Sequence, residues 1–482
     1  MNQVKVIAID QGTTSTKALL VDQFGKIELT FQKPHLQITP RAGWVEHDPE
    51  EIYTNILLAL ESAGSVDAIG LSHQGETIVA WDAITKKPLY NMIVWQDQRT
   101  EDRVMKLKEK GYESIILEKT GLPLDSYFPA SKFAWLLKNI DAVKQAYQEK
   151  HLRIGTSESF FLDRLTGIYG TDYNSASRTS LFNAKTLQWD EELCNIFSVP
   201  IELLPPIRNN IGFFGYHTLE GKKVPITAVM VDQFASAYGH GCRKSGDAKV
   251  TFGTGAFLQT IVGNNLVVDP SKKLSSALFW KFESEKPVYG LDAGVYNVGS
   301  AINWAKNIRL FDRYEEINTF EKKRAIERDI VFIPALSGLA CPYWDRTASG
   351  MWSGLSLETT REDMMQSILE GIAFRTANNL DAMESFTTLE NNISIDGGLV
   401  SNPYFIQFLA DILGKKISIP NNHELTGLGI GLLALKGLGV EESSSMVLAG
   451  KLTEPKNIDR KALIAQYESI LQKSRRTRSY SS

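Results

Sequence analysis

Two parts of the chain share one pattern of apolar and polar positions. Each has an apolar run of strand length, a short polar stretch rich in Gly and Thr, and a second apolar run. The runs and their connections are residues 4–9, 10–16 and 17–21 in the first half, and 248–252, 253–255 and 256–262 in the second. This pattern predicts a β-hairpin in each half. We therefore expect two similar domains that face one ligand.

Helical and strand-like segments alternate between the hairpins. Asp48 followed by Pro49 and two acidic residues is typical of a helix start. Amphipathic spacing predicts further helices at 131–137 and 361–374, and apolar runs predict strands at 68–71, 78–81, 224–231 and 393–396. The alternation indicates an α/β fold. We expect the domain boundary just before the second hairpin, which gives domains 1–244 and 245–482.

Composition narrows the class of protein. The 482 residues are 43% hydrophobic and 22% charged, which is ordinary for a globular protein, and the net charge of −4 argues against a nucleic-acid partner. No apolar run approaches the 18 residues that a membrane span requires, so no membrane insertion is expected. Cys194, Cys242 and Cys341 are few and far apart, which fits a cytoplasmic protein without a disulfide framework.

The first hairpin carries the strongest chemical signal. Asp10 ends an apolar strand, and Gly12, Thr13, Thr14 and Lys17 follow it. A carboxylate beside backbone N–H groups, hydroxyls and a lysine is an arrangement that holds a phosphate and Mg²⁺. The Gly-rich turns at 253–255 and 396–398 are suited to similar work, although such turns are more often purely structural.

Asp232 closes the apolar run 228–231, at the carboxyl edge where α/β sheets bind ligands. The alternative is an aspartate that caps the helix expected at 233–238. Likewise, Trp95 fits a core residue, Asp97 and Arg99 fit a local ion pair, and His73 fits a structural histidine. Ser72 and His73 lack the context of a hydrolase nucleophile.

Taken together, these residues resemble the FGGY family of carbohydrate kinases, and within it the glycerol kinase branch. The motifs that carry the resemblance are residues 7–17, 43–49, 90–96, 171–179, 350–355 with 369–373, and 396–402. The resemblance implies two ribonuclease-H-like domains of the actin-like ATPase fold, with ATP and substrate in a cleft between them. It also implies phosphorylation of a small polyol or sugar, glycerol first, with ATP and Mg²⁺ as cofactors and a homodimer as the default assembly.

The resemblance assigns roles to individual residues. Asp232 matches the general base and Asp10 matches the acid near Mg²⁺. The positions that match the nucleotide site are Gly12, Thr13, Thr14, Lys17, Gly253, Thr254, Gly255, Gly299, Asn303, Gly398 and Asn402. The positions that match the substrate pocket are Gly75, Glu76, Trp95, Tyr127, Asp232, Gln233 and Phe257. Asn303 stands where glycerol kinases usually carry Gln.

Gly75 departs from the family pattern, because glycerol kinases carry Arg there. Loss of that hydroxyl-binding donor weakens recognition of glycerol, and the space that it vacates suits a longer acceptor. A kinase for a tetritol, a pentitol, xylulose or ribulose is therefore the alternative to a glycerol kinase. A non-catalytic ATP- or sugar-binding sensor is the alternative from another class, but this chain keeps Asp232.

Overall fold

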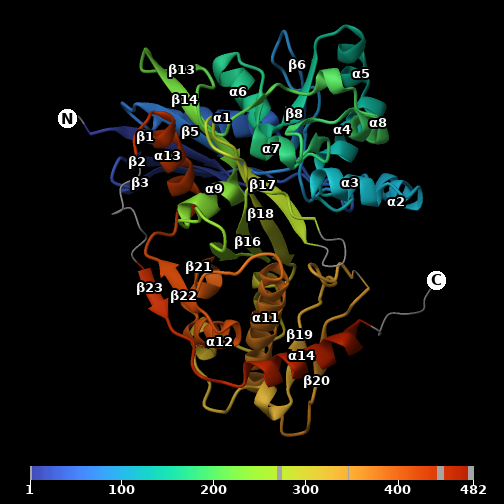
Figure 1. The fold of residues 1–482 in the computed structure, drawn as a ribbon, viewed down its shortest axis with the longest axis vertical. Helices are drawn as coiled ribbons and strands as arrows, with labels where there is room; N and C mark the ends of the chain where they lie inside the picture. The colour runs from blue at the N-terminus through green and yellow to red at the C-terminus, as the bar shows by residue number, and fades with distance from the viewer. Residues whose placement is uncertain (1–2, 269–273, 346, 442–449, 476–482) are drawn as a thin grey trace.

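The computed structural model describes residues 3–268, 274–345, 347–441 and 450–475. Two mixed sheets, one in each half of the chain, organise the molecule (Figure 1). In spatial order, the sheet of the first half contains β13 (Tyr216–Leu219), β14 (Lys222–Val231), β5 (Ala68–His73), β1 (Lys5–Gln11), β2 (Ser15–Asp22) and β3 (Ile27–Pro34). The sheet of the second half contains β17 (Ser275–Trp280), β18 (Val288–Val295), β16 (Ala256–Gly263), β15 (Ala248–Phe252), β21 (Asn392–Gly397), β22 (Lys416–Pro420) and β23 (Gly450–Thr453).

The two sheets repeat one topology. In the first, β1, β2 and β3 form an antiparallel meander, and β5 and β14 add parallel strands beside β1. In the second, β15, β16 and β18 form the meander, and β21 and β22 add the parallel strands. Both predicted hairpins are thus present, and each belongs to its own five-stranded unit of the same topology. The α/β class and the duplication predicted from the sequence are confirmed.

Smaller elements surround these sheets. The remaining strands are β4 (Glu46–His47), β7 (Met92–Ile93), β6 (Ile78–Asp82) and β8 (Leu152–Thr156) in a four-stranded sheet, and the pairs β9 (Thr171–Asp172) with β12 (Ile207–Arg208), β10 (Phe182–Asn183) with β11 (Gln188–Trp189), and β19 (Val331–Ile333) with β20 (Met351–Ser353). The helices of the first half are α1 (Pro49–Glu61), α2 (Glu101–Glu109), α3 (Glu113–Thr120), α4 (Pro129–Asn139), α5 (Asp141–Gln148), α6 (Ser157–Thr166), α7 (Tyr173–Ser177), α8 (Glu191–Phe197) and α9 (Asp232–Gly239). Those of the second half are α10 (Gly299–Asn307), α11 (Arg361–Glu384), α12 (Pro403–Leu413), α13 (Leu425–Gly437) and α14 (Arg460–Ser474).

Helix α13 lies away from its own half. It packs on the sheet of the first half, beside α9, and its apolar residues share one core with β1, β2 and β14 (Figure 1). Glycines allow the close approach: a Cβ at Gly429 would lie 1.8 Å from the carbonyl oxygen of Ala235, and one at Gly239 would lie 2.0 Å from that of Leu425. The sequence boundary near residue 244 therefore does not divide the packing of the molecule.

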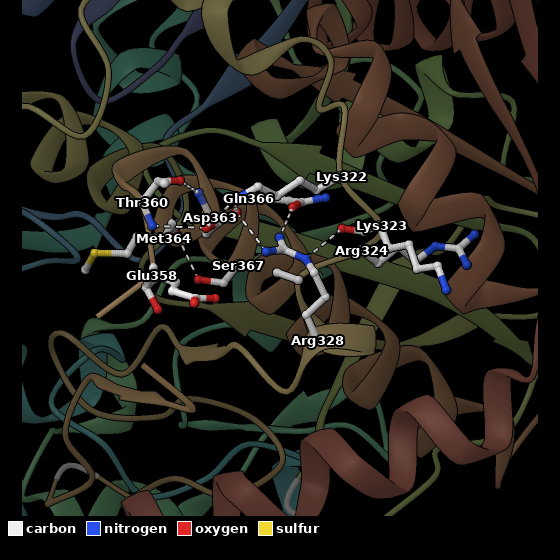
Figure 2. A network of polar contacts seen from close by, with 12 residues as sticks. Lys322, Lys323, Arg324, Arg328, Glu358, Thr360, Asp363, Met364, Gln366 and Ser367 are labelled. Atoms are coloured by element: carbon white, nitrogen blue, oxygen red, sulfur yellow. Dashed lines mark hydrogen bonds and ion pairs between the residues drawn. The ribbon is translucent and has the colours of Figure 1, made fainter. Parts of the chain in front are cut away.

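The central helix of the second half, α11, begins in a charged network (Figure 2). Thr360 and Asp363 form a capping box, and Asp363 also accepts from Lys322 and from Arg328 Nη1 at 2.8–3.0 Å. Burial opposes ionisation, but the hydrogen bonds from Thr360, Lys322 and Arg328 hold the pKa of Asp363 well below its usual value. The network fixes the helix that covers the second sheet.

Candidate functional site

Asp10 and Asp232 lie at the ends of β1 and β14, two strands of the first sheet that flank β5. Asp10 is the penultimate residue of β1, and Asp232 follows β14 as the first residue of α9. Burial, and then the charge of Asp10, raise the pKa of Asp232 to about 8. Burial raises the pKa of Asp10 to about 6, although Lys17 lowers it. Two buried acids with raised pKa values form a site that gains from a cation, and carboxylate oxygens are the ligands that Mg²⁺ prefers.

The turn after Asp10 is held from several sides. The hydroxyl of Thr13 accepts from Trp95 Nε1 at 3.1 Å, and its carbonyl lies 2.9 Å from His35 Nε2. The N–H of Gly12 donates to the carbonyl of Ser15 at 3.0 Å, so the turn itself uses it. Lys17 contacts both carboxylate oxygens of Glu424, just before α13, at 2.7 and 2.8 Å. The structure thus brings Trp95 to the predicted phosphate loop and gives Lys17 an acidic partner.

The second hairpin is clamped by the start of α10. The N–H groups of Val298 and Ser300 donate to the carbonyl of Thr254, and the N–H of Gly299 donates to that of Gly253 at 3.0 Å. A Cβ at Gly299 would lie 2.7 Å from this same carbonyl oxygen, so the close approach requires glycine. The contact positions the hairpin turn against one end of a cavity.

This cavity, of about 440 Å³, lies in the second half. Six predicted nucleotide residues line it: Gly253, Thr254, Gly299, Asn303, Gly398 and Asn402. The volume is in the range of small-molecule sites. Asn402 also caps α12 through the N–H of Phe405 and donates to the carbonyl of Ile317, so its amide has structural partners. The lining and the size of this cavity fit a nucleotide.

The predicted substrate residues gather where the two halves meet. Tyr127 contacts Trp95, with ring centroids 5.5 Å apart, and burial followed by the charge of Glu76 raises the pKa of its hydroxyl. Glu76 has a φ of +56°, in the left-handed region that residues other than glycine rarely occupy. Gln233 accepts from Lys249 Nζ at 3.2 Å, and Phe257 lies opposite Gly294 on β18.

Lys132 on α4 makes hydrogen bonds to the backbone of Trp95 and Tyr127. Its buried Nζ donates to the carbonyls of Tyr127 at 2.7 Å and of Trp95 at 3.3 Å. Burial lowers the pKa of Lys132 to about 7, although Asp97 and Glu76 raise it. A buried lysine that serves two carbonyls fixes the backbone beneath the predicted pocket.

Sequence reasoning missed four residues at this site: Arg178, Val231, Lys249 and Asp292. Arg178 Nε donates to Glu76 Oε1 at 2.5 Å, and its Nη2 lies 3.3 Å from Asp292 Oδ2, across the two halves. Arg178 stands inside the motif 171–179, which was used only as a landmark. The ion pair of Asp97 with Arg99, which the sequence did predict, is present at 2.7 Å.

Val231 alters the interpretation of Gly75. A Cβ on Gly75 would lie 2.7 Å from Val231 Cγ1, closer than packed carbon atoms approach. The valine therefore occupies the position where the side chain at 75 would begin. Loss of Arg at position 75 leaves no empty space next to the backbone, because Val231 fills it.

Comparisons with known proteins agree with this geometry. Residues 5–239 match the N-terminal domain of the FGGY family of carbohydrate kinases, and residues 248–438 match its C-terminal domain. Glycerol kinase of Francisella philomiragia is 37% identical over 95% of both chains, and glycerol kinase 2 of Thermotoga maritima is 34% identical over 97% of this chain and 98% of its own.

Solved structures give the same result. The crystal structure of Plasmodium falciparum glycerol kinase with ADP superimposes with a TM-score of 0.91, at 31% identity over 98% of both chains. A xylulose kinase from Lactobacillus acidophilus gives 0.85, at 25% identity over 98% of this chain and 96% of its own. In residues 3–268, 274–345, 347–441 and 450–475, no helix is long and apolar enough to cross a bilayer. This chain belongs to the FGGY family of carbohydrate kinases and is a phosphotransferase.

Proposed function

We propose that this protein transfers the terminal phosphoryl group of ATP to a hydroxyl of a small polyol, with glycerol as the first candidate. Asp232 supplies the observation that carries the proposal. It follows β14 as the first residue of α9, and burial and the charge of Asp10 raise its pKa to about 8. The relatives named glycerol kinase, at 34–37% identity over almost the whole chain, support glycerol.

The chain's own residues perform three tasks. Asp232 accepts the proton of the attacking hydroxyl, which requires its ionised form. Glu76, Trp95 and Tyr127 orient the acceptor, and Lys132 fixes the backbone of the latter two. The cavity at Gly253, Gly299 and Gly398 binds the nucleotide. Mg·ATP supplies the phosphoryl group and the positive charge that neutralises it.

Asp10 is the residue that we propose to hold Mg²⁺. Its carboxylate accepts from Ser72 at 3.3 Å, and its charge helps to raise the pKa of Asp232. Asp10 would hold the cation, whose charge would favour the ionised form of both acids, and Asp232 would then act as a base near neutral pH. A cytoplasmic homodimer remains the expectation for location and assembly.

A larger acceptor is the second candidate, because position 75 lacks the arginine of glycerol kinases. A xylulose kinase shares this fold with a TM-score of 0.85, so the fold is compatible with a larger acceptor. Val231 weighs against this candidate, since it fills the space beside Gly75.

The test is ADP release by the purified protein with Mg·ATP over a panel of acceptors. The panel contains glycerol, dihydroxyacetone, erythritol, threitol, ribitol, xylitol, xylulose, ribulose and gluconate. We expect the highest kcat/KM with glycerol, and a clear preference for a pentitol or ketose would replace it. Absence of turnover with every acceptor, together with unchanged ATP binding by Asp232→Asn, would favour the sensor.

A further inference from the structure

Arg178 has one nitrogen that the folded chain leaves without a partner. The residue is 3% exposed and stands just after α7. Its Nε pairs with Glu76 and its Nη2 with Asp292, whereas buried Nη1 has no hydrogen-bond partner within the part of the chain that the structure describes. A buried donor of a charged group is costly to leave unpaired, so Nη1 marks a place for an oxygen atom.

Arg178 lies between two aromatic rings and close to residues proposed to bind the acceptor. Its guanidinium carbon lies 5.4 Å from the ring centroid of Phe128 and 5.6 Å from that of Phe234. Arg178, Glu76, Asp292 and Asp232 are all close enough to Tyr127 to influence the pKa of its hydroxyl. The guanidinium is therefore next to Glu76 and close to Tyr127, two residues that the proposed function assigns to the acceptor.

A buried polar network fixes both partners of this pair. Asp172 caps α7 through the N–H of Ser175 at 3.0 Å, and His73 Nε2 lies 2.8 Å from the hydroxyl of Ser175. His73 ends β5, directly before the loop that carries Glu76. The network thus joins the segment that presents Arg178 to the segment that presents Glu76, which prepares the guanidinium for binding.

Charge selects the class of acceptor. Burial lowers the pKa of Arg178, but the charges of Glu76 and Asp292 hold it above its usual value. The guanidinium is therefore always charged, and it already faces two carboxylates. Asp10 and Asp232 add two more acids to the site. These acids repel an acceptor that carries its own carboxylate, whereas a neutral hydroxyl needs only a hydrogen-bond donor.

We propose that Arg178 binds the acceptor: its Nη1 donates to a non-reacting hydroxyl oxygen of a neutral polyol, in place of a side chain at position 75. The proposal rests on the proposed function and adds the residue and the charge class of the acceptor. Position 75 does not supply the donor, because glycine has no side chain and a Cβ there would lie only 2.7 Å from Val231 Cγ1.

The experiment compares wild type and Arg178→Lys with glycerol, 1,2-propanediol and 1,3-propanediol under saturating Mg·ATP. We expect Arg178→Lys to raise the KM for glycerol about 10- to 100-fold with a smaller change in kcat. We also expect wild type to reject one propanediol strongly and the variant to lose most of that discrimination. Gluconate should give at least 100-fold lower kcat/KM than glycerol in wild type.

Arg328→Lys is the control from outside the site, because the guanidinium of Arg328 is also held by hydrogen bonds, to Asp363, Gln366 and the carbonyl of Lys323, in the network of Figure 2. It should lower the melting temperature without changing the discrimination between acceptors. Equal discrimination in wild type and Arg178→Lys would overturn the role of Arg178, and efficient use of gluconate would overturn the charge class. If Arg178→Lys does not fold, wild type alone still decides: equal kcat/KM for glycerol and both propanediols overturns the hydroxyl contact. Absence of transfer to every polyol would instead reject the proposed function.

Discussion

The ends of β1 and β15 occupy equivalent places in two sheets of the same topology, and they carry an acid and a hydroxyl in exchanged positions. In the first half, Asp10 of β1 lies opposite Ser72 of β5. In the second half, Thr251 of β15 lies opposite Asp396 of β21. Each sheet thus has one acid and one hydroxyl at this point, but the acid stands on a different strand.

The exchange gives the two acids different properties. Burial raises the pKa of Asp396, but His240 and Lys249 hold it below its usual value. Burial raises the pKa of Asp10 to about 6, and Glu424 draws Lys17 into an ion pair. The acid of the second half is balanced within the fold, whereas that of the first half requires a further cation. The acid that we propose to hold Mg²⁺ therefore lies in one copy of the fold, and the cavity that we propose for the nucleotide lies in the other.

The largest expected effect comes from Asp232 of the first half, the acid that we propose as the general base. Asp232→Asn should lower kcat by about 10²–10⁴-fold, because the amide cannot take a proton from the hydroxyl. Steady-state ADP release and ATP binding by calorimetry measure the two halves separately. Retained turnover in the variant would remove Asp232 from the role of base.

A side chain added in the nucleotide cavity should act on the other half alone. No atom lies within 4 Å of a Cβ built on Gly398, which lines the cavity. We expect Gly398→Leu to raise the KM for ATP about 10- to 100-fold, since it fills the volume without disturbing the fold. The melting temperature should stay within about 2 °C of wild type. An unchanged KM for ATP would mean that the nucleotide lies elsewhere.

A side chain added at Gly75 should have the opposite signature. We expect Gly75→Ala to destabilise the protein by about 1–3 kcal/mol, because its Cβ overlaps Val231 Cγ1. Val231→Ala removes that atom, so the double variant should recover most of the loss in urea unfolding. If the loss of stability in the double variant equals the sum of the losses in the two single variants, the contact is contradicted.

The smallest effect is the opposite pH dependence of the two exchanged acids. The raised pKa of Asp10 means that ionisation costs stability as the pH rises from about 4 to about 6, so Asp10→Asn should be more stable than wild type above that window. The lowered pKa of Asp396 contributes stability above about pH 4 that is lost as the pH falls, so Asp396→Asn should be less stable at neutral pH.

The two differences have opposite signs and can be followed by thermal unfolding between pH 2 and 8 without Mg²⁺. Shifts of the same sign in both variants would show that the two acids do not differ as proposed.

The sequence allowed the local features to be predicted. Alternating apolar runs located both hairpins, and the residues that follow apolar runs led to Asp10 and Asp232, whereas Gly299, Asn303 and Asn402 were predicted only through the resemblance to the FGGY family. Arg178, Asp292 and Val231 were missed because their roles depend on contacts between distant segments. The valine conflicts with position 75 only after β14 and the loop beyond β5 are brought together.

Helix α13 shows the same limit. Its sequence is apolar on nearly every side, which indicates burial but does not say against what. Only the three-dimensional arrangement shows that it covers the sheet of the first half rather than its own.

The position of α13 also sets the order in which the molecule is completed on the ribosome. The first sheet emerges with residues 5–231, but the helix that shares its core ends at Gly437. An apolar face of that sheet therefore stays exposed to solvent while most of the second half is synthesised. Release of a chain cut at residue 244 should give an aggregating fragment, and co-expression of the missing part should rescue it.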